Sequence, residues 1–266
     1  MKDTKIADVP IFILCGGIGT RMKEETEFKP KPMVEVGGKP VVFHIMKTYS
    51  NYGFNHFVLC LGFKSEYVKD YFLNRRYLAN DFSVTSDQER VRILSSNEVE
   101  DWRIDLVDTG QNCMTGARIA RAYDRYYQDK DTFGVTYGDG LCDVNLRESF
   151  DFHQKNNSIG TITGVNPTSR FGELKTNGQK VEEFLEKPVL NDQWINGGYF
   201  FFNSNFRKYL TTDTNCILEQ SPLKSLSENG ELQVFKHSGF WRCMDTQRDK
   251  EELDILYKNG EMKWLY

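Results

Sequence analysis

Short apolar runs alternate with helix-like segments through the first 165 residues of this 266-residue chain. Three of the runs resemble buried strands and are followed within two residues by a glycine: 10–14, 56–61 and 132–137. Segments with apolar side chains at helical spacing lie between them: 41–52, 65–72 and 116–127. Ser65 is expected to cap the second of these helices. The alternation predicts an α/β fold, with a Rossmann-like, mostly parallel sheet, helices on both faces and ligands at the strands' carboxyl ends.

The pattern changes after about residue 165. Strand-like runs at 181–185 and 198–202 lie among loops rich in Gly, Asn and Lys, and amphipathic helices are expected at 217–229 and 246–259. No Pro/Ser-rich linker, repeat or low-complexity tract divides the chain. We therefore expect one domain whose C-terminal third adds further strands and helices.

Composition excludes several classes of protein. The net charge is −4 and no polybasic run is present, which disfavours nucleic acid as a partner. No stretch approaches the ~18 apolar residues of a membrane span, and the N-terminus does not resemble a signal peptide. Six cysteines are scattered without a CxxC pair, as expected for free thiols in a reducing compartment. We expect a cytoplasmic protein with no membrane partner.

A glycine-rich loop, GGIGTR at 16–21, follows the first strand. Glycines allow backbone N–H groups to approach an anion, and Arg21 adds positive charge. A Rossmann dinucleotide fingerprint is an alternative, but it requires a third glycine where Met22 stands. A plain tight turn is the other alternative.

Two more features are candidates for phosphate and metal binding. In Lys29-Pro30-Lys31-Pro32-Met33 the prolines restrict the backbone and so direct the lysines, although an isolated KPKP could be a solvated loop. Asp139 lies between two glycines after a strand, where a carboxylate often binds Mg²⁺, although Asp-Gly turns are common. Asp245 is one candidate for a second carboxylate, but it could equally be the N-cap of the last helix.

Together these segments resemble the sugar-1-phosphate nucleotidylyltransferases, and within them the glucose-1-phosphate cytidylyltransferases. The resemblance runs from about Ile11 to the C-terminus. The motifs that carry it occur in this order: GGIGTR (16–21), EETEFKPKPM (24–33), VDTGQNCMTGARI (107–119), TYGDG (136–140), RFGEL (170–174), EKP (186–188), INGGYF (195–200) and GFW..MDT (239–246). Each motif is weak alone, but eight in this order are specific.

The resemblance implies a single domain, 1–266, with a nucleotide-binding half at roughly 11–165 and a sugar-phosphate-binding part at 166–266. Its implied substrates are CTP and a sugar 1-phosphate, its cofactor is Mg²⁺, and a homo-oligomer is expected. The implied catalytic residues are Arg21 and Lys31. The implied nucleotide-binding residues are Leu14, Cys15, Gly16, Gly17, Ile18, Gly19, Thr20, Arg21, Lys31, Cys113, Arg118 and Gly138. The sugar-phosphate residues would be Glu186, Lys187 and Asn196, and the metal ligands Asp139 and Asp245.

The sequence departs from the family pattern at three positions. Cys113 stands where the family usually has a serine that touches the nucleotide, and Leu218 and Ser221 replace a Trp and a Glu of a WEQEPL-like segment. The change at 113 is expected to weaken a hydroxyl hydrogen bond to the nucleotide, and the changes at 218 and 221 leave oligomeric contacts or the fit of the acceptor open. The implied catalytic set is intact.

The implied reaction is in-line attack of a sugar-phosphate oxygen on the α-phosphorus. A phosphate monoester is largely ionised at pH 7, so no general base is required, and none of the motifs contains a histidine. Mg²⁺, Arg21, Lys31 and Lys187 would reduce the repulsion between the two anions.

Other functions remain open from the sequence: an NAD-dependent oxidoreductase, a non-catalytic sugar-nucleotide sensor, or transfer from UTP or dTTP or to another phosphorylated acceptor. Base choice cannot be derived from the residues.

Overall fold

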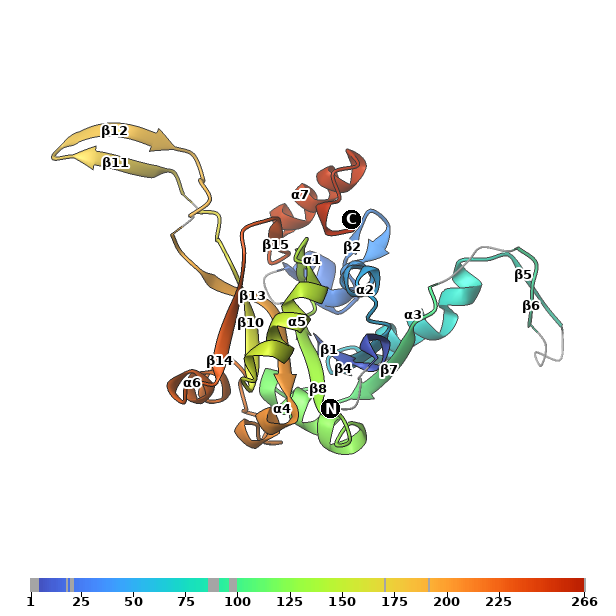
Figure 1. Ribbon diagram of the computed structural model, residues 1–266. Helices are drawn as coiled ribbons and strands as arrows, with labels where there is room; N and C mark the ends of the chain where they lie inside the picture. The colour runs from blue at the N-terminus through green and yellow to red at the C-terminus, as the bar shows by residue number, and fades with distance from the viewer. Residues whose placement is uncertain are drawn as a thin grey trace.

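A computed structural model describes residues 5–17, 19, 22–85, 91–95, 100–169, 171–190 and 192–265. Its centre is a seven-stranded sheet (Figure 1). The strands are, in spatial order, β14 (Leu232–His237), β10 (Gly160–Val165), β13 (Ile195–Asn203), β8 (Thr132–Tyr137), β1 (Pro10–Cys15), β4 (His56–Leu61) and β7 (Arg103–Asp108). β13 runs antiparallel to both neighbours, and the other pairs are parallel. The predicted mostly parallel sheet is confirmed.

Helices cover both faces of this sheet because the buried strands are apolar on both sides. Ile11 and Ile13 of β1 belong to one buried cluster, with residues of α2 (Val41–Asn51), α5 (Leu146–Asn156) and α7 (Gln247–Lys258). Phe12 and Leu14 face the opposite cluster, with α4 (Thr115–Tyr126) and α6 (Ser221–Glu228). Alternate residues of one strand therefore anchor two helical layers.

Several predicted elements are confirmed, and two details are wrong. The predicted helix at 41–52 is α2, and the predicted strands at 56–61 and 132–137 are β4 and β8. Ser65 does not cap α3 (Ser65–Leu78): it is the first helical residue, and Lys64 before it has left-handed backbone at φ 52° without a side-chain cap. The helix predicted from 217 begins at Ser221, with Pro222 in its first turn, where the missing N–H is tolerated.

Short elements at the edge of the sheet complete the body of the protein. They are α1 (Lys23–Thr26), the hairpin of β2 (Glu35–Val36) and β3 (Lys39–Pro40), and β9 (Gly140–Cys142) paired antiparallel with β15 (Trp241–Cys243). The β9–β15 pair is important for the site, because it joins the segment after β8 to the segment before α7.

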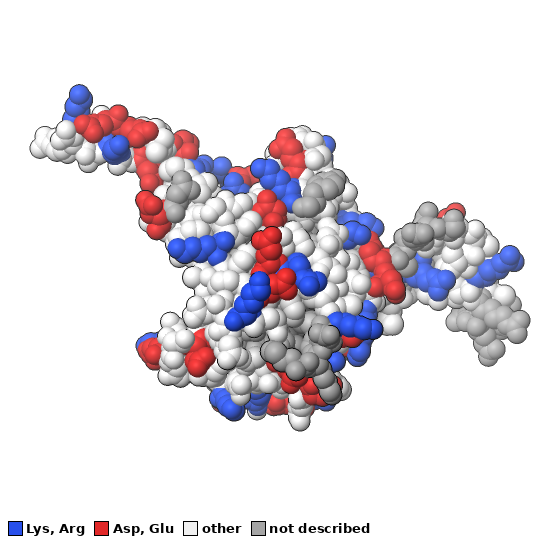
Figure 2. Space-filling view, viewed as in Figure 1, with Lys and Arg blue, Asp and Glu red and all other residues white. Residues whose placement is uncertain are grey.

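Two hairpins project from the body: β5 (Phe82–Val84) with β6 (Val91–Ile93), and β11 (Glu173–Asn177) with β12 (Lys180–Leu185) (Figure 1). Large apolar side chains on the second hairpin are exposed, including Leu174 at 56% and Phe184 at 61%. Figure 2 shows acidic and basic side chains interspersed on this face, without a broad area of one sign. None of the helices in the described residues is long and apolar enough to cross a membrane.

Candidate active site

A cavity of about 670 Å³ opens at the carboxyl ends of β1 and β8. Gly16 follows the last residue of β1, and Gly138 follows the last residue of β8. The cavity is lined by Leu14, Gly16, Gly17, Gly19, Lys31, Pro32, Gln111, Asn112, Cys113, Met114, Thr115, Arg118, Tyr137, Gly138, Asp139, Cys243 and Asp245. The glycine loop, the KPKPM segment, the 111–118 segment and the GDG turn therefore converge on one space.

The absence of side chains at two glycines allows this convergence. A Cβ added at Gly138 would lie 2.7 Å from the Leu14 carbonyl oxygen and 2.8 Å from Cγ of Pro32. A Cβ at Gly16 would lie 2.0 Å from Cζ of Arg118. A side chain at 138 would thus clash with the backbone of β1, and one at 16 would displace the Arg118 guanidinium.

Arg118 lines the cavity, but most of its hydrogen-bonding capacity is used inside the protein. One terminal nitrogen donates to the carbonyls of Leu61 and Gly110 and to Thr109 Oγ1, all at 2.9 Å. The other donates to the carbonyls of Gly16 at 3.0 Å and Gln111 at 3.2 Å. Burial lowers the pKa of this guanidinium. The side chain joins the last residue of β4 to the segments that follow β1 and β7, and so it holds the cavity wall in place.

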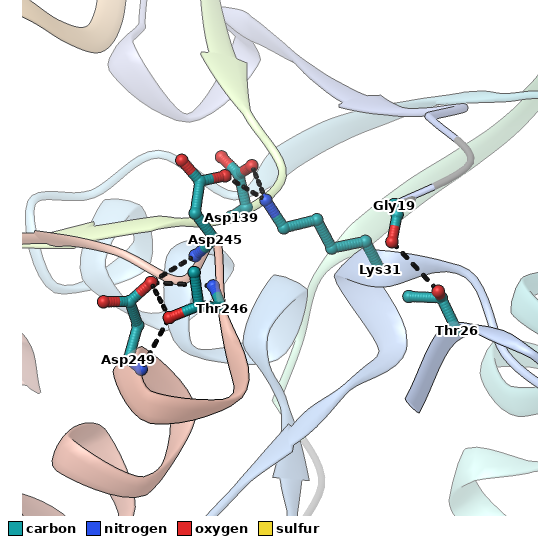
Figure 3. A network of polar contacts seen from close by, with 7 residues as sticks. All are labelled: Gly19, Thr26, Lys31, Asp139, Asp245, Thr246 and Asp249. Carbon is teal, nitrogen blue, oxygen red and sulfur yellow. Dashed lines mark hydrogen bonds and ion pairs between the residues drawn. The ribbon is translucent and has the colours of Figure 1, made fainter. Parts of the chain in front are cut away.

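Lys31 bridges the two carboxylates that the sequence singled out (Figure 3). Its Nζ lies 2.6 Å from Asp139 Oδ2 and 2.7 Å from Asp245 Oδ1. Burial acts to lower the pKa of Lys31, but its contacts with the two carboxylates outweigh this, and the pKa is raised. Lys31 is therefore a cation at neutral pH, and it lies between two carboxylates just beyond the carboxyl end of β8.

The backbone brings Asp245 to this position. β9 pairs with β15, and the Met244 N–H donates to the Asp139 carbonyl at 2.8 Å. The alternative that Asp245 is the N-cap of the last helix is wrong, because Thr246 caps α7. The capping box is completed by Asp249, whose Oδ2 accepts from the Thr246 N–H at 2.7 Å (Figure 3). The Asp245 carboxylate can therefore point to Lys31.

Sequence reasoning did not identify Cys243 as part of this group. One ligand atom from each of Asp139, Cys243 and Asp245 lies within 4.8 Å of the others. Burial and the two neighbouring carboxylates raise the pKa of the Cys243 thiol. Strand alternation was an available signal, since residues 243 and 245 share a side of an extended segment. The two carboxylates are hard oxygen donors of the kind that Mg²⁺ takes from proteins, whereas the protonated thiol is a poor ligand for it.

The three predicted sugar-phosphate residues are not brought together. Asn196 of β13 donates from Nδ2 to Tyr137 Oη at 2.9 Å, so it contacts the cavity wall. Glu186 and Lys187 follow β12 at the base of the projecting hairpin, where Lys187 Nζ lies 3.5 Å from Glu186 Oε1. Neither residue lines the cavity. Tyr137, Thr115 and Glu219, which were not singled out from the sequence, are linked by hydrogen bonds beside it.

The remaining nucleotide-side residues differ in how they are placed. Leu14, Gly17, Gly19 and Cys113 line the cavity, and Thr26 Oγ1 supports the loop by donating to the Gly19 carbonyl at 3.0 Å (Figure 3). Cys15 is only 1% exposed and does not line the cavity. Three of the predicted residues lie outside the described residues: Ile18, Thr20 and Arg21.

Comparison with known proteins identifies the class to which this fold and site belong. Residues 11–242 match the nucleotidyl transferase family, and the chain belongs to that family.

Within this family, the chain is 42% identical to the glucose-1-phosphate cytidylyltransferases of Salmonella typhimurium and Salmonella typhi, over 95% of this chain and 97% of each relative. The fold is also similar to the crystal structure of a UDP-glucose pyrophosphorylase complexed with UDP-glucose. That structure has a TM-score of 0.65 at 15% identity, covering 95% of this chain and 99% of the other.

Proposed function

We propose that this protein transfers CMP from CTP to α-D-glucose 1-phosphate, giving CDP-glucose and pyrophosphate. The observation that carries the proposal is the cavity at the carboxyl ends of β1 and β8, with Lys31 held between Asp139 and Asp245 at its wall. The 42% identity to glucose-1-phosphate cytidylyltransferases over nearly the whole chain supports the choice of substrates.

The residues of this site supply positive charge and positioning. The attacking group is an oxygen of the sugar phosphate, which is already ionised at neutral pH and needs no base. Consistent with this, no histidine occurs among the described residues that line the cavity. Lys31 would stabilise the negative charge that grows on the α-phosphate, and the glycine loop would let backbone N–H groups approach the phosphates. Arg21 is proposed to add charge from the same loop.

A divalent cation, proposed to be Mg²⁺, would be held by Asp139 and Asp245. When bound, it would supply electrostatic stabilisation to the phosphate oxygens. In this structure Lys31 forms ion pairs with both carboxylates, and its single positive charge offsets one of their two negative charges. With a cation between them, its ammonium would be free to turn on its flexible stem toward the α-phosphate. Loading the metal and freeing the lysine are thus coupled by charge.

On the acceptor side, Asn196 is proposed to bind the sugar phosphate from β13, while Glu186 and Lys187 would bind it from the base of the hairpin. Gly16, Gly17, Gly19, Gly138 and Leu14 are proposed to surround the nucleotide. Cys113 would lie against the nucleotide with a thiol in place of a hydroxyl, and Arg118 would act there mainly by shaping the wall.

We also propose that the protein is a cytoplasmic homo-oligomer. The exposed apolar side chains of the two projecting hairpins support association with further copies of the chain. All six cysteines are unpaired, which supports a reducing compartment.

A matrix of nucleotides and sugar phosphates, assayed by pyrophosphate release with Mg²⁺, tests the function. We expect CTP with glucose 1-phosphate to be turned over fastest. Equal or faster turnover with dTTP or UTP would assign the chain to another nucleotide. Binding of CDP-glucose without turnover of any pair would instead support a sensor.

A further inference from the structure

The segment at 214–218 is hydrogen-bonded to the start of α4, which forms part of the cavity wall. Met114 N–H donates to the Thr214 carbonyl at 2.8 Å, and Ala117 N–H donates to the Cys216 carbonyl at 3.1 Å. Leu218 is fully buried, and its N–H donates to Thr115 Oγ1 at 2.8 Å. The backbone that precedes Glu219 is therefore held at several points, although Glu219 itself is exposed.

The Glu219 carboxylate receives two hydrogen bonds from residues that line the cavity. Tyr137 Oη donates to Oε1 at 2.5 Å, and Thr115 Oγ1 donates to Oε2 at 2.9 Å. Burial and the nearby Glu219 carboxylate raise the pKa of Tyr137, so the phenol keeps its proton and remains a donor. Glu219 thus connects the end of β8 to the start of α4.

These bonds, together with the Gly198 N–H, fix the orientation of a third side chain, Asn196. A phenol has one O–H to donate, and Tyr137 donates it in the hydrogen bond to Glu219, so Tyr137 Oη can only accept from Asn196. Asn196 meets this requirement by directing Nδ2 to Tyr137 at 2.9 Å, which directs its Oδ1 to the Gly198 N–H at 2.8 Å. The Tyr137 ring is also confined by Gly198, where an added Cβ would lie 2.6 Å from the ring. Without an acceptor at 219, the phenol O–H could donate a hydrogen bond to Asn196 instead. The Asn196 amide would then have to rotate by about 180° to present its oxygen.

We propose that Glu219 is a positioning residue for the acceptor: through Tyr137, it helps to hold the orientation of the Asn196 amide, which is proposed to bind the sugar phosphate. This inference rests on the proposed function, because it takes Asn196 as an acceptor-binding residue. It also gives a role to the LEQSPL segment, which the sequence set apart by its differences at Leu218 and Ser221.

The test is a set of four variants: Glu219→Leu, Glu219→Gln, Tyr137→Phe and Glu219→Leu with Tyr137→Phe. Glu219→Leu removes both acceptor oxygens and should raise KM for glucose 1-phosphate about tenfold, the value of one good hydrogen bond. The Kd for CTP, measured by titration calorimetry, should stay within about twofold. Glu219→Gln retains one acceptor oxygen for Tyr137, so its KM for glucose 1-phosphate should lie close to that of the wild type. Glu228→Gln, at the far end of α6, is the matched control.

The double variant separates a positioning role from a general one. If Glu219 acts through Tyr137, the double variant should be no worse than Tyr137→Phe alone. Additive effects on KM, or a wild-type KM in Glu219→Leu, would overturn the inference. The free energy of unfolding of the same four variants and the wild type, measured in urea, should show non-additive effects at positions 137 and 219. Additive effects on this free energy would also overturn the inference. The measurement uses no substrate, so it tests the contact between Glu219 and Tyr137 separately from the proposed function. Turnover of a different substrate pair by the wild type would correct the proposed function alone, and KM would then be measured with that pair.

Discussion

The proposed nucleotide side and the proposed acceptor side of this site are built in different ways. The nucleotide side is formed by segments at the carboxyl ends of central-sheet strands, and Arg118 connects the ends of β1, β4 and β7. On the proposed acceptor side, Asn196 is part of the central sheet, but Glu186 and Lys187 follow a hairpin whose strands are exposed along their whole length. Two-stranded hairpins have little stability of their own.

This difference leads to an expectation about how the two substrates bind. The cavity proposed for the nucleotide is already present, with walls formed by segments packed on the core. The acceptor site, as proposed, would need groups at the base of the hairpin to approach Asn196. Substitutions on the nucleotide side are therefore expected to have large effects on kcat and on the free energy of unfolding. Substitutions in the hairpin should have smaller effects, mainly on KM for the acceptor.

The largest effect is expected at the two carboxylates. Asp139→Asn and Asp245→Asn should each lower kcat about 10²- to 10³-fold with the fold intact, since each removes a charged oxygen donor for the metal. EDTA should abolish activity of the wild type, and added Mg²⁺ should restore it. Asp151→Asn, an exposed carboxylate beside Arg147, serves as the control. Near-normal turnover of either variant at saturating Mg²⁺ would remove that residue from the metal site.

Arg118→Met should show whether the nucleotide side is held rigid by one side chain. The change leaves buried carbonyls without donors and should lower the free energy of unfolding by about 3 kcal/mol. Arg125→Met, on the exposed side of the same helix, loses one solvent-exposed hydrogen bond to the Asp108 carbonyl and should change it by less than about 1 kcal/mol. Urea denaturation measures both. A wild-type free energy of unfolding in Arg118→Met, accompanied by weaker CTP binding, would indicate that Arg118 serves the nucleotide directly.

Lys31→Gln should lower kcat about 10²-fold, with a smaller effect on KM for the sugar phosphate, because its charge is needed as the α-phosphorus becomes more negative. The variant also removes the ammonium that lies between Asp139 and Asp245, so Mg²⁺ should raise its melting temperature more than it raises that of the wild type. Lys29→Gln, in the same loop, controls for charge. An unchanged kcat, or equal shifts in melting temperature, would contradict the role given to Lys31.

The sequence predicted the framework of the site better than its connections. The glycines that follow β1 and β8 predicted the position of the cavity. The alternation of strands and helices implies a parallel sheet, in which the carboxyl ends of these strands lie at the same edge. The meeting of Lys31 with Asp245, 214 residues apart, depends on a pair of three-residue strands, β9 and β15, which have no clear periodic signal. Likewise, no local pattern could show that the N–H groups of Arg118 donate to backbone carbonyls. Nor could it show that Glu219 accepts a hydrogen bond from Tyr137, a residue 82 positions away in the sequence. These contacts follow from tertiary packing.

The smallest effect is expected at Lys187, and it tests the acceptor side most directly. Lys187 is half-buried at the base of the hairpin, and its ammonium is 3.5 Å from Glu186, so it can reorient toward an incoming phosphate at little cost. Lys187→Ala should raise KM for glucose 1-phosphate about tenfold and lower kcat a few-fold, because a misplaced attacking oxygen also slows the reaction. KM for CTP should be unchanged. Lys180→Ala, on the exposed strand of the same hairpin, removes an equal charge and should leave all three constants unaltered. If Lys187→Ala changes only KM for CTP, the hairpin serves the nucleotide, and the division of the site into a core-anchored nucleotide side and a hairpin-assisted acceptor side is wrong.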